Sequence, residues 1–158
     1  MPKPLVGIVM GSQSDSPIME EVSRILEEFG IKYEMVVTST HRSPRKTRDY
    51  AQKAAERGLE VIIAGAGGSA ALAGAMASET TLPVIGVPID SSALKGLDAL
   101  FSTVQMPSGV PVATMAIGKT GAINAGILTA QILALKYPEI RERLNNFKMK
   151  LSQGAGKK

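Results

Sequence analysis

The chain has one histidine, His41, which lies in the polar segment Ser39-Thr40-His41-Arg42. An imidazole can accept and donate a proton near neutral pH, and a neighbouring guanidinium can hold a phosphate or carboxylate within its reach. A lone histidine is more often a structural hydrogen-bonding residue than a catalyst. Because this segment directly follows a β-branched run, at the end of an expected strand, we expect His41 to transfer protons at a site for a small anion.

A second polar segment, Gly11-Ser12-Gln13-Ser14-Asp15, follows the first expected strand and opens a helix. Its amides and hydroxyls can meet an anion at the helix N-terminus. Asp15 can either cap that helix or accept hydrogen bonds from a sugar hydroxyl, and the pattern alone leaves both open. The segment has neither the lysine of a Walker loop nor the spaced glycines of a dinucleotide-binding fingerprint.

Glycine-rich and proline-containing segments supply two further candidates. Gly65-Ala66-Gly67-Gly68-Ser69 indicates a backbone that approaches either a ligand or another helix closely, and composition does not choose between them. Gln105-Met106-Pro107-Ser108-Gly109 is typical of a simple Pro-Gly turn.

The elements that must position these residues alternate between strands and helices, a pattern typical of an α/β protein with a parallel sheet. We expect strands at 5–10, 33–38, 61–64, 84–87 and 112–117. We expect helices at 17–29, 44–58, 70–80, 122–137 and 138–151. Ligands of such sheets bind beyond the carboxyl ends of the strands, so the clusters around Ser12, His41 and Gly67 should share one edge.

No repeat or linker divides the chain, so we expect one catalytic domain over residues 1–152 and a disordered tail over 153–158. The absence of cysteine excludes disulfides and thiolate chemistry, and a single histidine makes a tightly bound transition metal unexpected. The N-terminus lacks a signal-peptide pattern and no apolar run is long enough to span a bilayer. We therefore expect a cytoplasmic protein with no membrane partner.

The formal net charge is +4, and basic residues concentrate near His41 and at the C-terminal end. Three Phe, three Tyr and no Trp offer few stacking surfaces for nucleic acid. A basic cluster beside a lone histidine fits a small anionic ligand better than a polynucleotide.

Six motifs in order resemble class I N5-carboxyaminoimidazole ribonucleotide mutase, the PurE family of purine synthesis. They cover about residues 5 to 137 and are Gly11-Ser12-x-Ser14-Asp15, Ser39-x-His41-Arg42-x-Pro44, Ala64-Gly65-Ala66-Gly67-Gly68, Leu82-Pro83-Val84-Ile85-Gly86-Val87-Pro88, Gly96-Leu97-Asp98 and Val104-Gln105-Met106-Pro107-x-Gly109.

The resemblance implies a three-layer flavodoxin-like domain with a central parallel sheet and a C-terminal helix, assembled as a homo-octamer without cofactor or metal. It implies an isomerase that moves a carboxylate from the exocyclic nitrogen of a ribonucleotide to C4 of its imidazole, through CO2 that is released and recaptured. His41 would be the general acid and base. The resemblance also implies a set of substrate-binding residues, which are Ser12, Asp15, Ser39, Arg42, Gly67 and Gly68.

The chain departs from the family at one loop, where class I enzymes usually read Ala-Ala-His-Leu-Pro-Gly after the paired glycines. Here Ala71 and Ala73 occupy the positions of the second histidine and the proline. Two alternatives therefore stay open: a carboxylase that adds free CO2 to aminoimidazole ribonucleotide, as class II members do, or a ribonucleotide-binding protein without catalysis. Arg42 and Gly68 fit class I better.

Overall fold

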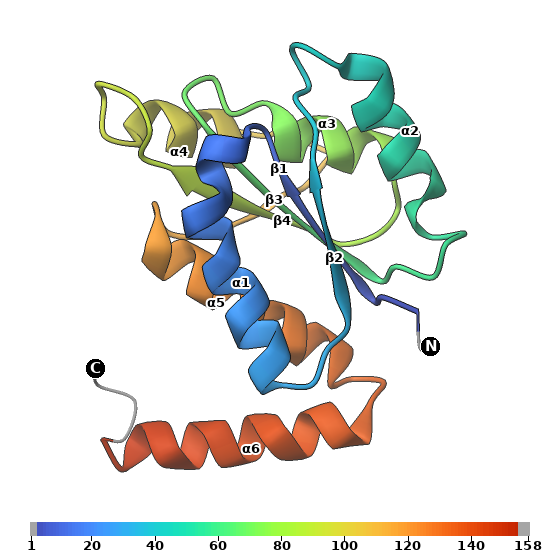
Figure 1. The fold of residues 1–158 in the computed structure, drawn as a ribbon, viewed down its shortest axis with the longest axis vertical. Helices are drawn as coiled ribbons and strands as arrows, with labels where there is room; N and C mark the ends of the chain where they lie inside the picture. The colour runs from blue at the N-terminus through green and yellow to red at the C-terminus, as the bar shows by residue number, and fades with distance from the viewer. Residues whose placement is uncertain (1–2, 155–158) are drawn as a thin grey trace.

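The computed structural model describes residues 3–154, which build a five-stranded, wholly parallel sheet with helices on both faces (Figure 1). The strand order is β2-β1-β3-β4-β5, the flavodoxin-like arrangement. The strands are β1 (Val6–Met10), β2 (Tyr33–Val37), β3 (Val61–Gly67), β4 (Val84–Ile89) and β5 (Ala113–Thr114). The fold class expected from the sequence is confirmed.

The central strands are apolar because both of their faces are covered. Every residue of β1 and β4 is buried, as a parallel sheet between two helical layers requires. The edge strand β2 is half-buried along its length, and Glu34 is its one charged residue.

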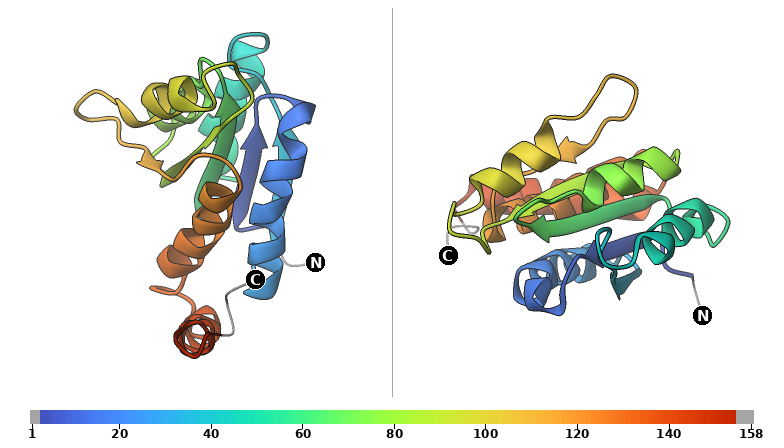
Figure 2. Two further views of the ribbon diagram at one scale, coloured as in Figure 1. Left: turned by 90° about the vertical axis from the view of Figure 1, so that its left-hand side faces the viewer. Right: turned by 90° about the horizontal axis from the view of Figure 1, so that it is seen from above.

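The helices are α1 (Ser16–Glu28), α2 (Pro44–Ala54), α3 (Leu72–Glu79), α4 (Leu97–Val104), α5 (Lys119–Leu133) and α6 (Pro138–Ser152), with a short 3-10 turn η1 (Gln13–Asp15) before α1. One apolar core joins the sheet to α1, α5 and α6, and a second joins its other face to α2 and α3. Figure 2 shows these helical layers on either side of the strands. Among residues 3–154, no helix is both long and apolar enough to cross a membrane.

The first helical layer depends on close backbone contact between α1 and α5. A Cβ atom at Gly126 would lie 2.7 Å from Ile25 Cγ2, so the glycine lets the two helices approach. α6 lies across their ends at the base of Figure 1, where the Phe29 and Phe147 rings meet edge to face at 5.5 Å. The apolar residues of the predicted helix 122–137 are thus largely covered within the chain.

The largest differences between the structure and the expected elements are in three places. Residues 88–111, for which the sequence predicts no helix, contain α4, whose one face is buried and whose other face is apolar and exposed. β5 pairs through only two residues rather than six. α5 begins at Lys119 rather than Ala122, directly after Gly118, whose φ of 75° and ψ of −145° suit glycine. Of the expected tail, 155–158 lie outside the described residues, and Gln153 and Gly154 form a turn that ends α6.

Candidate active site

A cavity of about 280 Å³ opens at the carboxyl edge of the sheet, where the loops after β1, β2, β3 and β4 meet. The strand order reverses between β1 and β3, which is where ligands of such sheets bind. The residues that line the cavity are Gly11, Ser12, Ser14, Asp15, Ser39, Thr40, His41, Arg42, Ala66, Gly67, Ser69, Ala71, Leu72 and Ser91. The three polar clusters therefore share one edge, as the sequence predicts.

The loop after β1 is held by reciprocal hydrogen bonds between Ser12 and the residues that follow it. Ser12 has extended backbone and caps η1, and its hydroxyl accepts from Ser14 N at 3.3 Å and Ser14 Oγ at 3.0 Å. Asp15 Oδ2 accepts from Ser12 N at 3.1 Å, which completes a capping box. Within residues 3–154, Asp15 Oδ1 accepts no hydrogen bond, so this carboxylate can cap the loop and still bind a sugar hydroxyl.

Asp15 is only 5% exposed. Burial raises the pKa of its carboxyl group, and the hydrogen bond from Ser12 N and the charge of Arg42 oppose that rise. Burying this carboxylate lowers the stability of the folded state. Carboxylates in such positions at the edge of a cavity are typical of ligand-binding sites.

The loop after β2 brings the guanidinium of Arg42 over the end of β1. Ser39 organises the turn, because its hydroxyl accepts from Arg42 N at 3.1 Å and its carbonyl accepts from Ser43 N at 2.7 Å. Arg42 Nη2 then donates to Gly11 O at 3.1 Å, which joins the two loops across the cavity. Four donors of the planar guanidinium stay available for an anion.

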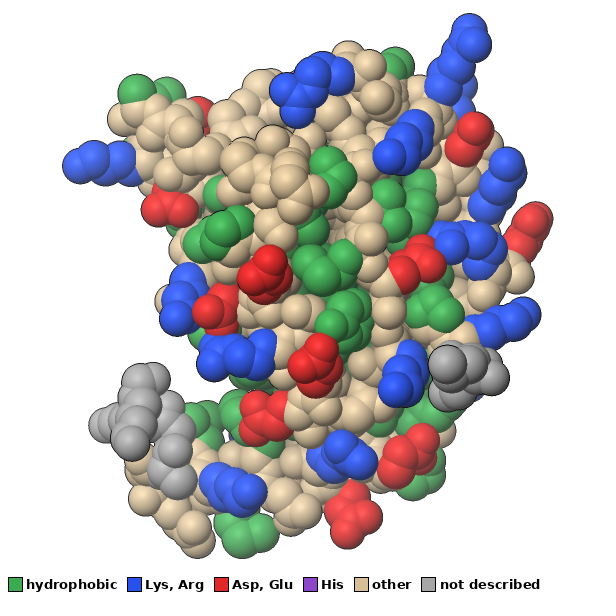
Figure 3. Space-filling view, viewed as in Figure 1, with side chains coloured by type: hydrophobic (Ala, Val, Ile, Leu, Met, Phe, Trp, Pro, Cys, Tyr) green, Lys and Arg blue, Asp and Glu red, His purple; other side chains and the backbone are tan. Residues whose placement is uncertain are grey.

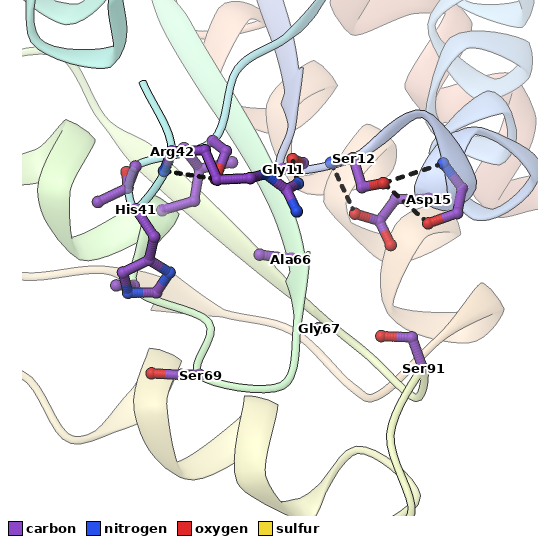
Figure 4. Close-up of a pocket in the computed structure, with 14 residues that line it drawn as sticks. Gly11, Ser12, Asp15, His41, Arg42, Ala66, Gly67, Ser69 and Ser91 are labelled. Atoms are coloured by element: carbon purple, nitrogen blue, oxygen red, sulfur yellow. Dashed lines mark hydrogen bonds between the residues drawn. The ribbon is translucent and has the colours of Figure 1, made fainter. Parts of the chain in front are cut away.

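The side chain of His41 is exposed and projects over the cavity, as Figure 4 shows. Neither ring nitrogen forms a hydrogen bond within the described residues, so both can act on a ligand. The preceding Thr40 is different: its Oγ1 is a buried side-chain atom without a hydrogen-bond partner in residues 3–154. A buried hydroxyl without a partner costs free energy, and this one lies next to His41 in the lining of the cavity.

The two glycines at the carboxyl end of β3, Gly67 and Gly68, have separate roles. Gly67 is the last residue of the strand and lines the cavity. Gly68 has φ +60° and turns the chain away, and it is not among the lining residues. The structure therefore brings together Ser12, Asp15, Ser39, His41, Arg42 and Gly67, with Gly68 shaping the loop behind them.

The sequence analysis names Ser69 only as the end of the glycine-rich segment and does not name Ser91, although both line the cavity. Ser69 follows the glycines that were singled out, whereas Ser91 follows β4 and carries no recognisable signal beyond its place after a strand. Ala71 also lines the cavity, while Ala73 is 3% exposed and packs in the core. Of the two unusual alanines, only Ala71 can touch a ligand directly.

The chemistry available here is proton transfer beside an anion site. Among residues 3–154, no three His, Asp or Glu side chains are grouped to hold a metal ion. A flavodoxin-like sheet with a small polar cavity at its switch point, one imidazole and one guanidinium defines an α/β protein that binds a small anionic ligand.

Comparison with known proteins gives the family. The family model for AIR carboxylase matches residues 5–154. Three relatives named N5-carboxyaminoimidazole ribonucleotide mutase come from Pyrococcus horikoshii, Thermotoga maritima and Vibrio cholerae. They are 62%, 58% and 53% identical to this chain, covering 92%, 95% and 94% of it and 81%, 86% and 92% of their own lengths. The chain therefore belongs to the AIR carboxylase family.

A solved structure agrees with this assignment. The crystal structure of Treponema denticola PurE superposes with a TM-score of 0.87 at 29% identity, covering 97% of this chain and 94% of that one. The resemblance to PurE proteins that the motifs indicate is confirmed.

Proposed function

We infer that this protein is an N5-carboxyaminoimidazole ribonucleotide mutase, an isomerase that moves a carboxylate from the exocyclic nitrogen to C4 of the imidazole. The observation that carries the inference is the 53–62% identity, over nearly the whole chain, to relatives that bear this name. The cavity supports it, because it combines one proton carrier with an anion-binding guanidinium.

In the proposed reaction the carboxylate leaves the exocyclic nitrogen as CO2, and the nitrogen receives a proton from His41. C4 of the imidazole then attacks the CO2, and His41 recovers a proton from C4. The proton count is balanced, so no oxidant, metal or external base is required. A trapped CO2 must be held close to C4 and away from water, which a small cavity at the strand ends favours.

The other residues have binding roles in this proposal. Arg42 and Ser12 would hold the phosphate and ribose, and Asp15 would accept from a ribose hydroxyl through its free oxygen. Ser39 fixes the turn that carries His41 and Arg42. Gly67 would pass its backbone along the imidazole, and Gly68 would set the turn that follows it.

A carboxylase that takes free CO2 is the second candidate, favoured by one observation: Ala71, at the position where the resemblance to class I implies a histidine, lines the cavity. The decisive experiment supplies each substrate in turn to the purified protein, in buffer depleted of bicarbonate. A mutase converts N5-carboxyaminoimidazole ribonucleotide under these conditions, whereas a carboxylase acting on aminoimidazole ribonucleotide stalls. Binding without turnover of either substrate would instead identify a catalytically inactive ribonucleotide-binding protein.

We also propose that the chain assembles as a homo-octamer. The number of subunits comes from the resemblance to PurE proteins, and a contact between subunits is supported by an apolar surface on and beside α4 that no other segment of residues 3–154 covers. This α4 surface consists of Leu94, Leu97, Phe101 and Val104, which are 61%, 52%, 59% and 44% exposed. Exposed apolar residues at helical spacing are typical of a contact between subunits.

The proposed ligand is a small metabolite rather than a nucleic acid. On the face shown in Figure 3, Lys and Arg side chains are interspersed with Asp and Glu instead of forming one continuous basic surface. A cytoplasmic location is part of the proposal, because phosphorylated ribonucleotides are made and used inside the cell.

A further inference from the structure

Ser91 lies in the loop after β4 and lines the cavity, yet it belongs to none of the motifs that suggest the function. Figure 4 shows its hydroxyl directed toward the cavity, on the same side as Ser12 and Asp15, with His41 at the opposite side. Within the described residues, Ser91 Oγ forms no hydrogen bond. It is therefore a polar group at the ligand site whose hydrogen-bonding capacity is not used within residues 3–154.

The next residue, Ser92, provides the contrast. Its hydroxyl donates to Asp98 Oδ2 at 2.6 Å and accepts from Leu94 N at 3.3 Å, and its carbonyl accepts from Lys95 N at 3.1 Å. These bonds tie the loop to the first turn of α4. The two adjacent serines thus have different roles. Ser92 forms the hydrogen bonds that fix the loop backbone, whereas the side chain of Ser91 faces the cavity.

Contact with β3 sets the position of Ser91 as well. A Cβ atom at Gly67 would lie 1.8 Å from Ser91 Oγ, so the hydroxyl occupies the space that a side chain at residue 67 would take. Ser91 Oγ is therefore seated against the strand end that forms the floor of the cavity. A ligand lying along Gly67 must pass within reach of this hydroxyl.

We propose that Ser91 is a substrate-contacting residue whose hydroxyl donates a hydrogen bond to the ribose 5-phosphate part of the ribonucleotide. The assignment to that part rests on the proposed function, in which the imidazole faces His41. In Figure 4 Gly67 lies between His41 and Ser91, and Ser91 is on the side of Ser12 and Asp15. A ligand whose imidazole extends along Gly67 toward His41 therefore has its ribose end facing the Ser91 hydroxyl.

The test compares Ser91→Ala with Ser92→Ala in the full-length protein. For Ser91→Ala we expect KM for N5-carboxyaminoimidazole ribonucleotide to rise about tenfold, with kcat within about twofold and the melting temperature unchanged. The affinity for ribose 5-phosphate, measured by calorimetry, should fall by a similar factor. Ser92→Ala should lower the melting temperature instead, because it removes the bond to Asp98.

Three results would overturn the proposal: an unchanged KM in Ser91→Ala, an unchanged affinity for ribose 5-phosphate, or a loss of melting temperature equal to that of Ser92→Ala. The calorimetric measurement keeps this inference separate from the proposed function. If the unmodified protein turned over neither substrate, the mutase assignment would fail, whereas the loss of ribose 5-phosphate affinity in Ser91→Ala would still support the contact.

Discussion

Gly67 and Ser91 fit together at the floor of the cavity, with Ser91 Oγ only 1.8 Å from where a Cβ atom of residue 67 would be. The carboxyl end of β3 and the loop after β4 can meet only because residue 67 has no side chain. The same absence leaves the backbone of Gly67 open to a ligand.

Gly67→Ala should therefore displace Ser91 and narrow the cavity. The added methyl also meets Ser91 Cβ at 3.1 Å and Ile89 O at 3.2 Å, so rotation of the hydroxyl alone does not relieve the contact. We expect the free energy of unfolding to fall by about 1–3 kcal/mol and turnover to be largely lost. Adding Ser91→Gly should recover much of the stability, measured by urea denaturation, but not the activity. Equal destabilisation in the single and double variants would exclude this contact as the cause.

His41→Asn should abolish turnover and leave ribonucleotide binding nearly intact. Asparagine keeps polar atoms of similar reach but cannot carry a proton between nitrogen and C4, so kcat should fall by about 10²-fold or more. The side chain is exposed and forms no hydrogen bond within residues 3–154, so the melting temperature should not change. The measurements are steady-state kinetics and calorimetric binding; retained turnover would falsify the proton-shuttle role.

Asp15→Asn should raise the stability of the protein and weaken its binding of the ribonucleotide. Burial raises the pKa of Asp15, so the ionised carboxylate destabilises the folded state. The protonated carboxyl group contributes stability at low pH, and that contribution is lost as the pH rises through the pKa of the folded state. An amide oxygen can still accept from Ser12 N, so the variant should melt higher than the unmodified protein at neutral pH and bind the ribonucleotide more weakly. The stability gain should shrink as the pH is lowered into the range where Asp15 is protonated. A gain that is the same at acidic and neutral pH would show that the charge is not its source.

Thr40→Val should stabilise the protein. The hydroxyl of Thr40 is buried without a partner in the described residues, and valine replaces it with a methyl group of the same shape. We expect the free energy of unfolding to rise by up to about 1 kcal/mol, measured by urea denaturation. Thr47→Val is the matched control, because Thr47 Oγ1 hydrogen-bonds Thr38 Oγ1 at 2.9 Å and its loss should destabilise. A destabilised Thr40→Val variant would mean that the hydroxyl has a partner, such as a bound water.

The proposed octamer depends on the α4 surface, so Phe101→Ser should break the assembly into smaller species. Phe101 lies at the middle of that surface and is 59% exposed in the single chain. Leu135→Ser is the control, because Leu135 is 80% exposed but lies in the turn after α5 rather than on α4. Sedimentation velocity distinguishes the two variants. An unchanged mass for Phe101→Ser, or equal dissociation of both variants, would contradict an interface built on α4.

The sequence by itself determined the class of fold and the location of the site. Apolar runs of strand length separated by amphipathic segments specify a parallel sheet, and ligand loops of such a sheet must follow its strands. That rule was enough to bring His41, Ser12 and Gly67 to one edge. The motifs around them were sufficient for the family.

Only the tertiary structure decided the features that depend on distant segments. α4 could not be predicted from periodicity because it is short, it buries the small residues Ala99 and Thr103, and its larger apolar side chains Leu97, Phe101 and Val104 are exposed. Ser91 joins the site through its approach to Gly67, a contact between two strand ends that no local pattern encodes. Gly67 and Gly68 are adjacent in sequence, yet only Gly67 lines the cavity, because the positive φ of Gly68 turns the chain away from it. Local propensity specifies elements, whereas packing in three dimensions selects which side chains meet.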